Sequence, residues 1–247
     1  MILEESAIII TGAAGNIGEA LVISLSKKAK QVFALDFNEN GLTKFKALRN
    51  VNCSKVDVTD EDNVDKFFSS MDGEFSSFGL LNAAGIIFNR PLVNLLDREN
   101  PIHPLEDFKR VIDLNLTGTF IMGSHFSNFC IKKRKKACVV NFSSVTASGN
   151  IGQSAYSASK AAVESLSRVW AKELGMFKIR AVSIAPGFFD TESTSESLSE
   201  AVIKKYKTNI PLKKFGNLQD LEEAIEFILS NEYYTGEVLA LNGGYRV

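Results

Sequence analysis

Residues 7–18 read AIIITGAAGNIG, and this stretch decides the fold. A run of β-branched residues predicts a buried strand at residues 7–11, and an apolar pattern of helical period begins at Ile17 and continues to residue 28. The turn between them is rich in glycine and alanine, which let a backbone approach a pyrophosphate, while the first amides of a helix attract anions. Many such turns need glycine only for positive φ. The position between a strand and a helix nevertheless favours a dinucleotide site at Gly12, Asn16, Ile17 and Gly18.

The remaining chain repeats this alternation of apolar strands and amphipathic helices. Further strands are predicted at residues 31–36, 52–58, 79–82, 137–142, 179–184 and 237–241, and further helices at residues 62–71, 105–132, 157–174 and 218–229. Strands that are apolar on both faces and are separated by helices indicate a parallel sheet with helices on each side. No linker, repeat or low-complexity tract interrupts the chain. We therefore expect one α/β, doubly wound domain over residues 1–247 with about seven parallel strands.

Composition and charge exclude several classes of protein. A hydrophobic share of 45% and a charged share of 23% are typical of a globular domain, and the net charge of −1 argues against nucleic-acid or membrane binding through bulk electrostatics. No apolar stretch approaches the roughly 20 residues of a membrane helix, and the acidic residues in the opening MILEES do not fit a signal peptide. Three cysteines and two histidines lack metal-ligand spacing. We expect a cytoplasmic protein with reduced thiols and without a metal site, a nucleic-acid partner or a membrane partner.

The ends of later strands supply further contacts for a dinucleotide. Asp36 ends the second predicted strand, where a carboxylate can accept hydrogen bonds from ribose hydroxyls and would repel a 2′-phosphate. No Lys or Arg lies in residues 11–18 or directly after Asp36, so NAD(H) is favoured over NADP(H); a helix N-cap or turn role for Asp36 is the alternative. Contacts at the ends of the third and fourth strands are predicted for Asp57, Val58, Asn82, Ala83, Ala84 and Gly85.

Tyr156 and Lys160 form the most informative pair of residues. Residues four apart on a helix share a face, so both polar groups can enter one site. A free tyrosine has a pKa of about 10, and a neighbouring ammonium together with a positively charged nicotinamide would lower that pKa toward use as a base. Ser143 and Ser144 end the strand before this helix, where a hydroxyl can hold a substrate carbonyl beside the tyrosine. Asn115, on the preceding helix, can anchor a water that relays protons to Lys160.

These motifs, in this order along nearly the whole chain, resemble the short-chain dehydrogenase/reductase family. The resemblance implies a Rossmann-type domain in which Tyr156 is the general acid/base, Lys160 binds the nicotinamide ribose and tunes the tyrosine, and Asn115 holds the relay water. Asn16 and Ala83 depart from the family's glycine-rich and Asn-Asn-Ala-Gly motifs. Asparagine tolerates positive φ, so cofactor binding is expected to survive. The match to the family's Pro-Gly-x-x-x-Thr segment implies nicotinamide contacts by Pro186, Gly187, Phe189 and Thr191.

The resemblance leaves two candidates for the catalytic serine. A spacing of thirteen residues before Tyr156 selects Ser143, whereas alignment of the strand text NFSS selects Ser144. A one-residue deletion is easier in the loop at residues 145–154 than a slip of the strand, which would turn every side chain to the other face. Ser144 is therefore predicted to be the catalytic serine.

The substrate side is less specific in sequence. Residues 188–210 are rich in Ser, Thr and Glu and resemble the family's substrate loop. The long segment 86–105 resembles 3-hydroxyacyl-CoA dehydrogenases, and the ending NGGY at 242–245 resembles 3-oxoacyl-acyl-carrier-protein reductases. Both act on β-hydroxy or β-keto thioesters, so we expect that substrate class, carried by coenzyme A or acyl carrier protein. Steroid, sugar and small secondary-alcohol dehydrogenases, and a non-catalytic cofactor-binding scaffold, are the alternatives.

Two further features concern partners. The run KKRKK at residues 132–136 ends a predicted helix, where cations complement the helix dipole; the alternative role is to dock an acidic carrier or coenzyme A phosphates. The family resemblance implies a homotetramer, with the helices around residues 105–132 and 157–174 packed against their symmetry mates. On the second helix, core and interface would share the apolar residues Val163, Leu166, Val169 and Trp170.

Overall fold

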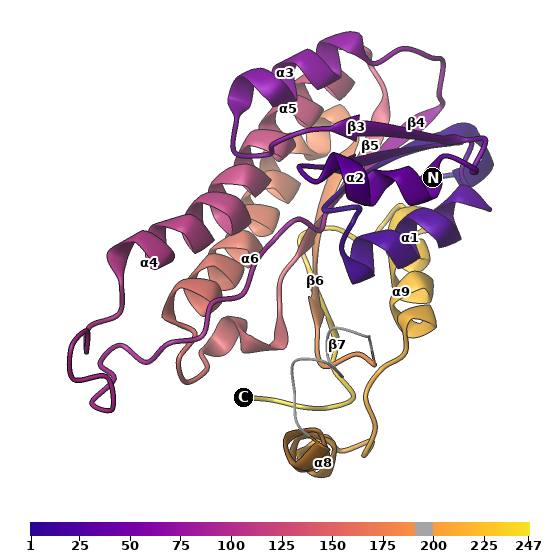
Figure 1. Ribbon diagram of the computed structural model, residues 1–247. Helices are drawn as coiled ribbons and strands as arrows, with labels where there is room; N and C mark the ends of the chain where they lie inside the picture. The colour runs from indigo at the N-terminus through magenta and orange to yellow at the C-terminus, as the bar shows by residue number, and fades with distance from the viewer. Residues whose placement is uncertain (191–199) are drawn as a thin grey trace.

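The computed structural model describes residues 1–190 and 200–247, and its centre is a seven-stranded sheet (Figure 1). Every neighbouring pair of strands is parallel, in the order β3-β2-β1-β4-β5-β6-β7. The strands are β1 (Ser6–Thr11), β2 (Gln31–Asp36), β3 (Val51–Lys55), β4 (Ser77–Asn82), β5 (Lys136–Phe142), β6 (Ile179–Pro186) and β7 (Val238–Leu241). The predicted fold class, a doubly wound α/β sheet with parallel strands, is confirmed.

Helices cover both faces of the sheet because successive side chains of a strand point to opposite sides. The helices are α1 (Asn16–Ser26), α2 (Glu39–Leu42), α3 (Glu61–Ser70), α4 (Leu105–Ile112), α5 (Gly118–Lys132), α6 (Ser154–Leu174), α8 (Glu200–Asn209) and α9 (Leu218–Ser230). Ile8 and Ile10 of β1 join the core cluster under α1 and α9, whereas Ile9 joins the cluster under α3, α5 and α6. Within the described residues, each helix is too short or too polar to span a bilayer.

The helix predicted over residues 105–132 is present with the predicted bounds, and it contains one π-helical turn that was not predicted from the sequence. α4 and α5 are separated by a π-helical turn at Asp113–Thr117, in which the amide of Gly118 donates to the carbonyl five residues back. The turn places Asn115 in the interior, where its side chain forms two hydrogen bonds with the backbone of Ile86. Apolar periodicity carries no signal for such tertiary bonds, and π-helical turns are frequent at functional sites.

Two other boundaries bear on the site. α6 begins three residues earlier than predicted, at Ser154, so Tyr156 lies within its first turn. β3 ends at Lys55 rather than at residue 58, which leaves Asp57 on a turn outside the sheet.

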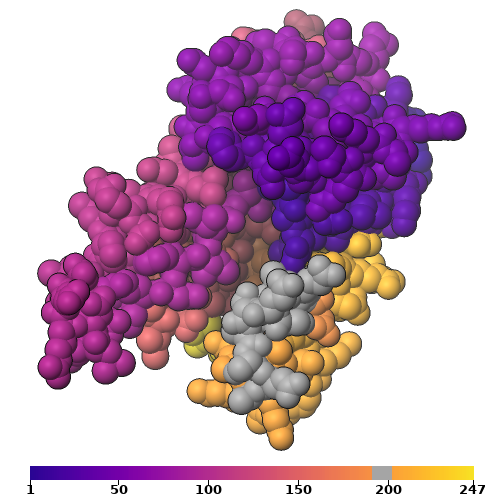
Figure 2. Space-filling model, in the orientation of Figure 1, coloured from indigo at the N-terminus to yellow at the C-terminus, as the bar shows by residue number. Residues whose placement is uncertain are grey.

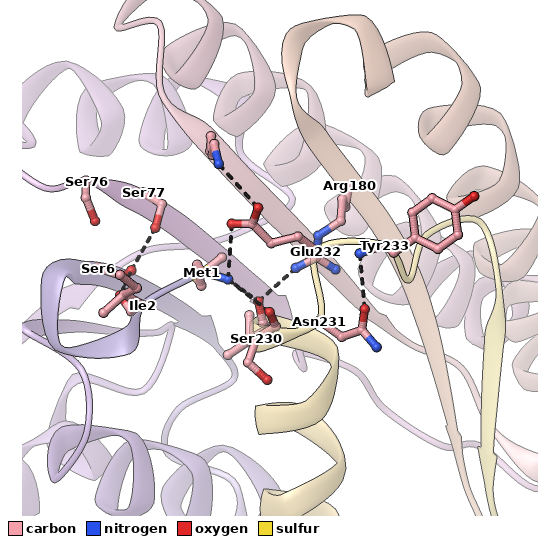
Figure 3. A network of polar contacts seen from close by, with 12 residues as sticks. Met1, Ile2, Ser6, Ser76, Ser77, Arg180, Ser230, Asn231, Glu232 and Tyr233 are labelled. Atoms are coloured by element: carbon pink, nitrogen blue, oxygen red, sulfur yellow. Dashed lines mark hydrogen bonds and ion pairs between the residues drawn. The ribbon is translucent and has the colours of Figure 1, made fainter.

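The carboxyl end of α9 is fastened to the sheet by Arg180 of β6 (Figure 3). The Arg180 guanidinium donates, at 2.8–2.9 Å, to the carbonyls of Ile228, Leu229 and Tyr234. The last carbonyls of a helix have no partner within the helix, so a cation there satisfies them and complements the dipole. Lys136, the last residue of the KKRKK run, lies at this amino edge of the sheet and pairs with Glu232 at 3.3 Å.

The turn between β1 and α1 excludes side chains at two positions. Gly12 has a φ of +66°, and a Cβ there would lie 2.7 Å from the Cα of Ala84. A Cβ on Gly18 would collide with the carbonyl oxygen of Gly12. Asn16, however, does not have the positive φ that we expected it to tolerate. It begins α1 with room for a side chain, so that part of the sequence interpretation is wrong.

Replacing Gly18 with alanine is expected to lower the free energy of unfolding by about 1–3 kcal/mol, because relief of the collision must displace backbone. Gly175→Ala is the matched control, since a Cβ on Gly175 would meet no atom within 4 Å. Urea unfolding of both variants measures the difference. A Gly18→Ala variant as stable as the Gly175→Ala variant would contradict the tight turn.

Candidate active site

The residues predicted to bind a ligand gather at the carboxyl ends of the strands. β1 lies between β2 and β4, so the strand order reverses there, and such a switch point opens a crevice for a ligand. The Thr11 hydroxyl donates to the carbonyl of Leu81 (3.4 Å) and accepts from the amide of Ala84 (3.1 Å). These two bonds hold the ends of β1 and β4 together at the base of the crevice.

The start of α1 suits an anion at this edge. Gly15 is the N-cap and offers no side chain to the first helical amides, which belong to the predicted contacts Asn16, Ile17 and Gly18. Unpaired amides at a helix start, together with the helix dipole, favour a bound anion. With Gly12 and Gly18 free of Cβ atoms, the turn fits the pyrophosphate of a dinucleotide.

Asp36, at the end of β2, holds the glycine-rich turn. Its carboxylate accepts from the amides of Ala14 (2.9 Å) and Asn38 (2.8 Å). Each carboxylate oxygen can accept a second hydrogen bond, and the side chain is partly exposed. The turn role, given above as the alternative, is therefore present in the structure, and it leaves acceptor capacity for the predicted contact with a ribose.

Lys44 is a further cation at this turn, and the sequence motifs do not reveal it. The Lys44 ammonium donates to the carbonyl of Ala14 (3.3 Å) and forms an ion pair with Glu19. α2 and the residues after it bring Lys44 back to the turn from outside residues 11–18, so a local motif cannot reveal it. A cation at this position would attract the 2′-phosphate that distinguishes NADP from NAD. Glu19 already pairs with this ammonium.

The contacts predicted at the ends of β3 and β4 fall into different environments. Val58, Asn82 and Ala84 lie together at the end of β4, in a closely packed spot without room for a water molecule. Asp57 instead caps its own turn, because its carboxylate accepts from the amide and the hydroxyl two residues further on. Ala83 packs against the core cluster under α1.

Tyr156 and Ser144 meet at the start of α6. Burial raises the pKa of Tyr156, and the neighbouring Ser144 hydroxyl partly opposes that rise. Ser144 follows β5 by two residues, and its Oγ also accepts from the amide of Thr146 (3.2 Å), which fixes the serine in place. A phenol with a raised pKa is protonated at neutral pH, so Tyr156 can donate a proton to a ligand beside Ser144.

Lys160 lies one helical turn further and is buried. Its Nζ donates to the carbonyl of Phe142 (2.7 Å) and lies 5.6 Å from the centre of the Tyr156 ring. Burial lowers the pKa of Lys160 to about 8. An amine with a pKa near neutrality can carry positive charge and can also exchange a proton.

The side chains of Asn115 and Lys160 both lie beside Gly85. A Cβ on Gly85 would be 3.1 Å from Oδ1 of Asn115 and 3.5 Å from Nζ of Lys160. Asn115 accepts from the amide of Ile86 (2.8 Å) and donates to the Ile86 carbonyl (2.9 Å) and to the Ser159 hydroxyl (3.3 Å). Both amide protons are used within the protein, which leaves one lone pair on Oδ1 for the predicted relay water.

Ser143 faces α6 and is buried. Its Oγ lies 2.8 Å from Oε1 of Glu164 and 3.2 Å from the carbonyl of Lys160. A hydroxyl has one proton to donate, so Ser143 is engaged in joining β5 to α6. The contact between Ser144 and Tyr156 therefore supports Ser144 as the serine on the ligand side. Glu164 was not predicted, and its sequence signal is the spacing of one helical turn after Lys160.

A chain of buried polar side chains lies beneath the site. Asn82 donates to Asn141 (2.9 Å), Asn141 donates to Ser167 (2.9 Å), and the hydroxyls of Ser167 and Ser183 are 2.7 Å apart. The chain joins β4, β5, α6 and β6, and so fixes the strand ends relative to the helix that carries Tyr156. Periodicity assigns these positions to the core and does not reveal that they bond to one another.

The nicotinamide contacts predicted at the end of β6 and after it do not all lie in the same environment. A Cβ on Gly187 would lie 2.8 Å from the Cα of Asn242, so the backbone after Pro186 passes close to the end of β7. The side chain of Phe189 is buried in the core cluster under α1 and α9. Thr191, together with the other residues of 191–199 within the predicted substrate loop, lies outside the described residues.

Residues 86–104 form an arm beside α4 (Figure 1). The amide of Arg90 donates to the carbonyl of Gly152 (2.7 Å), which ties the arm to the loop that leads into α6. The amide of Asn100 and the guanidinium of Arg90 hold the pKa of Asp97 below its usual range. The ion pair between Arg90 and Asp97, at 2.9 Å, links two parts of the arm. The arm thus borders the residues that position Tyr156.

The fold and the site define a dinucleotide-binding type of α/β protein in which a half-buried tyrosine lies beside a buried lysine, and known proteins share these features. A family model described as Enoyl-(Acyl carrier protein) reductase matches residues 12–246. The 3-oxoacyl-(acyl-carrier-protein) reductase FabG of Thermotoga maritima is 34% identical over 99% of both chains. Human 3-hydroxyacyl-CoA dehydrogenase type-2 is 32% identical over 97% of this chain and 94% of that protein. The solved structure of 4-hydroxyisoleucine dehydrogenase complexed with NADH is 31% identical, with a TM-score of 0.86 over 97% of this chain and 98% of that chain.

The protein therefore belongs to the short-chain dehydrogenase/reductase family, as the motifs predicted, and is an oxidoreductase of that family.

Removing the hydroxyl of Ser143 and of Ser144 in separate variants tests which of the two is the catalytic serine. Ser144→Ala removes the hydroxyl that opposes the raised pKa of Tyr156, so the pH profile of alcohol oxidation should shift upward while kcat falls about 10²-fold. Ser143→Ala should keep the pH profile and cost about 1 kcal/mol of stability through the lost bond to α6. Steady-state rates across the pH range and thermal unfolding measure these effects. A shifted profile in Ser143→Ala alone would assign the role to Ser143.

Proposed function

We propose that the protein is an NAD-dependent dehydrogenase/reductase that interconverts a secondary alcohol and a ketone. The proposed substrates are 3-hydroxyacyl and 3-oxoacyl thioesters of coenzyme A or acyl carrier protein. The observation that carries the proposal is the Tyr156 hydroxyl, whose pKa is raised by burial and which has the Ser144 hydroxyl beside it. A proton donor and a carbonyl-binding hydroxyl at the edge of a dinucleotide crevice suit the reduction of a ketone.

Each residue of the site has a separate role in this proposal. A bound nicotinamide supplies or accepts the hydride. Ser144 holds the substrate oxygen, and Tyr156 gives its phenolic proton to that oxygen during reduction and takes a proton back during oxidation. The ammonium of Lys160, held by the carbonyl of Phe142, stabilises the phenolate form of Tyr156. Asn115 fixes the backbone that passes beside Lys160.

NAD(H) is proposed over NADP(H) because of charge at the end of β2. The carboxylate of Asp36 is held at the turn by two amides, and it would repel a 2′-phosphate. Lys44 favours the second candidate, NADP(H), because its ammonium would attract that phosphate. The ion pair with Glu19 offsets this attraction.

The thioester substrate class is supported by the names of two relatives, a 3-oxoacyl-(acyl-carrier-protein) reductase and a 3-hydroxyacyl-CoA dehydrogenase. A small hydroxy acid is the second candidate, favoured by the similarity to a 4-hydroxyisoleucine dehydrogenase. A non-catalytic cofactor-binding scaffold is disfavoured by Lys160. A buried amine is costly to the fold, and a scaffold has no chemical need for it.

We also propose a homotetramer located in the cytoplasm. Val163 and Trp170 of α6 are buried in the core, whereas Val169 is 43% exposed. Phe108 on α4 and Phe120 on α5 are likewise exposed, and exposed apolar side chains on three helices support a surface for self-association. The cytoplasmic location is supported by the three cysteines, which are all free.

Tyr156→Phe should lower kcat by about 10²–10⁴-fold, the usual contribution of a general acid/base. Nucleotide affinity should stay unchanged, because the substitution removes only the phenolic oxygen. Absorbance of reduced nicotinamide with a panel of 3-hydroxyacyl thioesters, hydroxy acids, steroids and sugars measures turnover and substrate class together. Equal turnover by the Tyr156→Phe variant would contradict the proposed chemistry, and activity confined to hydroxy acids would select the second substrate class.

Asp36→Asn should raise the ratio of kcat/KM for NADP to kcat/KM for NAD by at least about tenfold, because it removes the charge that opposes a 2′-phosphate. Asp57→Asn is the matched control, since that carboxylate caps its own turn, and it should leave the ratio unchanged. Initial rates with both coenzymes measure the ratio. A preference for NADPH in the unsubstituted protein would contradict the role given to Asp36.

A further inference from the structure

A strongly basic surface lies on α8 and the turn that follows it. Residues 201–216 read AVIKKYKTNIPLKKFG, with five lysines and no acidic residue. Within the part of the chain that the structure describes, none of these lysines forms an ion pair with a carboxylate. A concentration of unpaired cations of this kind is an electrostatic site for an anion.

The surface contains a hollow of about 350 Å³, lined by Ile203, Lys204, Lys207, Thr208 and Lys213. Two of its three ammonium groups are held in place. Lys213 donates to the carbonyl of Thr208 (2.5 Å), and Lys207 lies over the ring of Phe215, 5.0 Å from its centre. The hollow is open to solvent and has the volume of a small-ligand site, which suits a charged, partly hydrated group such as a phosphate.

Aromatic contacts fasten this hollow to the catalytic edge of the sheet. Phe188, two residues beyond β6, lies 4.3 Å from the ring centre of Tyr206 on α8 and 5.7 Å from that of Phe215. Phe189 and Gly216 also form a parallel bridge. α8 therefore lies near the carboxyl ends of β6 and β7 (Figure 1), and Figure 2 shows its side of the molecule as a space-filling surface.

The KKRKK run at residues 132–136 lies at the opposite edge. Lys136 begins β5, whereas Ser144 follows its other end, and a strand of this length extends about 20 Å. Lys136 is also paired with Glu232. The docking role considered for this run is therefore less compatible with the site than the same role on α8.

We propose that the α8 hollow binds the phosphate groups of a coenzyme A thioester and so fixes the far end of the substrate while its acyl end reaches Tyr156. This inference rests on the thioester chemistry proposed above. Phosphate oxygens and lysine ammonium groups form charge-assisted hydrogen bonds. Coenzyme A carries a diphosphate and a 3′-phosphate, so several ammonium groups around one hollow match its charge.

Two matched double variants test the hollow. Lys204→Gln with Lys207→Gln removes two charges that line it, whereas Lys205→Gln with Lys214→Gln removes two charges of the same segment outside it. The first pair is expected to weaken binding of free coenzyme A, measured by calorimetry, at least tenfold, and to raise KM for a 3-hydroxyacyl-CoA by a similar factor. The second pair should leave both values within about twofold of the unsubstituted protein.

A truncated substrate separates this inference from the proposed function. The N-acetylcysteamine thioester has the same acyl group and no phosphate, so its kcat and KM should be the same in all three proteins. Turnover of the truncated thioester with equal coenzyme A affinity in both double variants would overturn the hollow as a phosphate site and leave the proposed function intact. No turnover of any thioester would remove the proposed function, and calorimetry would still report on the hollow.

Two further results complete the test. Lys204→Gln alone keeps the contact of Lys207 with Phe215, so a several-fold loss of coenzyme A affinity in this variant, with unchanged thermal unfolding, supports the hollow and rules out misfolding. An effect confined to a carrier-protein-bound substrate, with the acyl-CoA unaffected, would overturn the proposal in favour of protein docking.

Discussion

The close approach of β1 and β4 at their carboxyl ends is the contact on which the rest of the site depends. Thr11 bonds to both Leu81 and Ala84, and Gly12 passes so near Ala84 that a Cβ has no space. Because the strand order reverses at β1, the same contact opens the crevice and directs the start of α1 toward it. One residue past Ala84, Gly85 passes beside both Asn115 and Lys160. A single steric constraint thereby joins the cofactor half of the site to the catalytic half.

The catalytic half adds a second constraint, which is a polar layer inside an apolar core. Lys160 is buried with the carbonyl of Phe142 as its acceptor, and its lowered pKa reflects the cost of holding the charge there. Ser143 and Glu164 join β5 to α6 next to that lysine, and the chain from Asn82 to Ser183 continues the layer across three strands. Buried polar groups that bond to one another in this way make a core specific rather than more stable, and Oδ1 of Asn82 is left without a partner at the end of the chain. The fold accepts this cost where the chemistry needs a fixed lysine and tyrosine.

The sequence predicts the parts of this arrangement that follow from local pattern. Apolar runs locate the strands, and because parallel strands end at one edge, the positions of Gly12, Asp36 and Ser144 follow from those runs. The four-residue spacing of Tyr156 and Lys160 likewise predicts a shared face. Lys44 and Glu164 were missed because tertiary folding brings them to their partners. The π-helical turn around Asn115 was missed for the same reason. The Asn115 side chain in this turn bonds to the backbone of Ile86, which is distant in sequence.

The substrate half is less predictable because neither of its flanking segments supplies a strand to the sheet. The arm at residues 86–104 and α8 both project beyond the carboxyl edge (Figure 1), and neither has to fill a position in the core. Their chemistry differs: Leu95 and Leu96 at the tip of the arm are exposed, whereas residues 201–216 carry five lysines. A ligand with an apolar chain and a phosphorylated end would match both segments, while a small hydroxy acid would have no use for either. The contrast between the two flanks is the physical basis for the long, amphipathic substrate that we propose, and it does not depend on the names of the relatives.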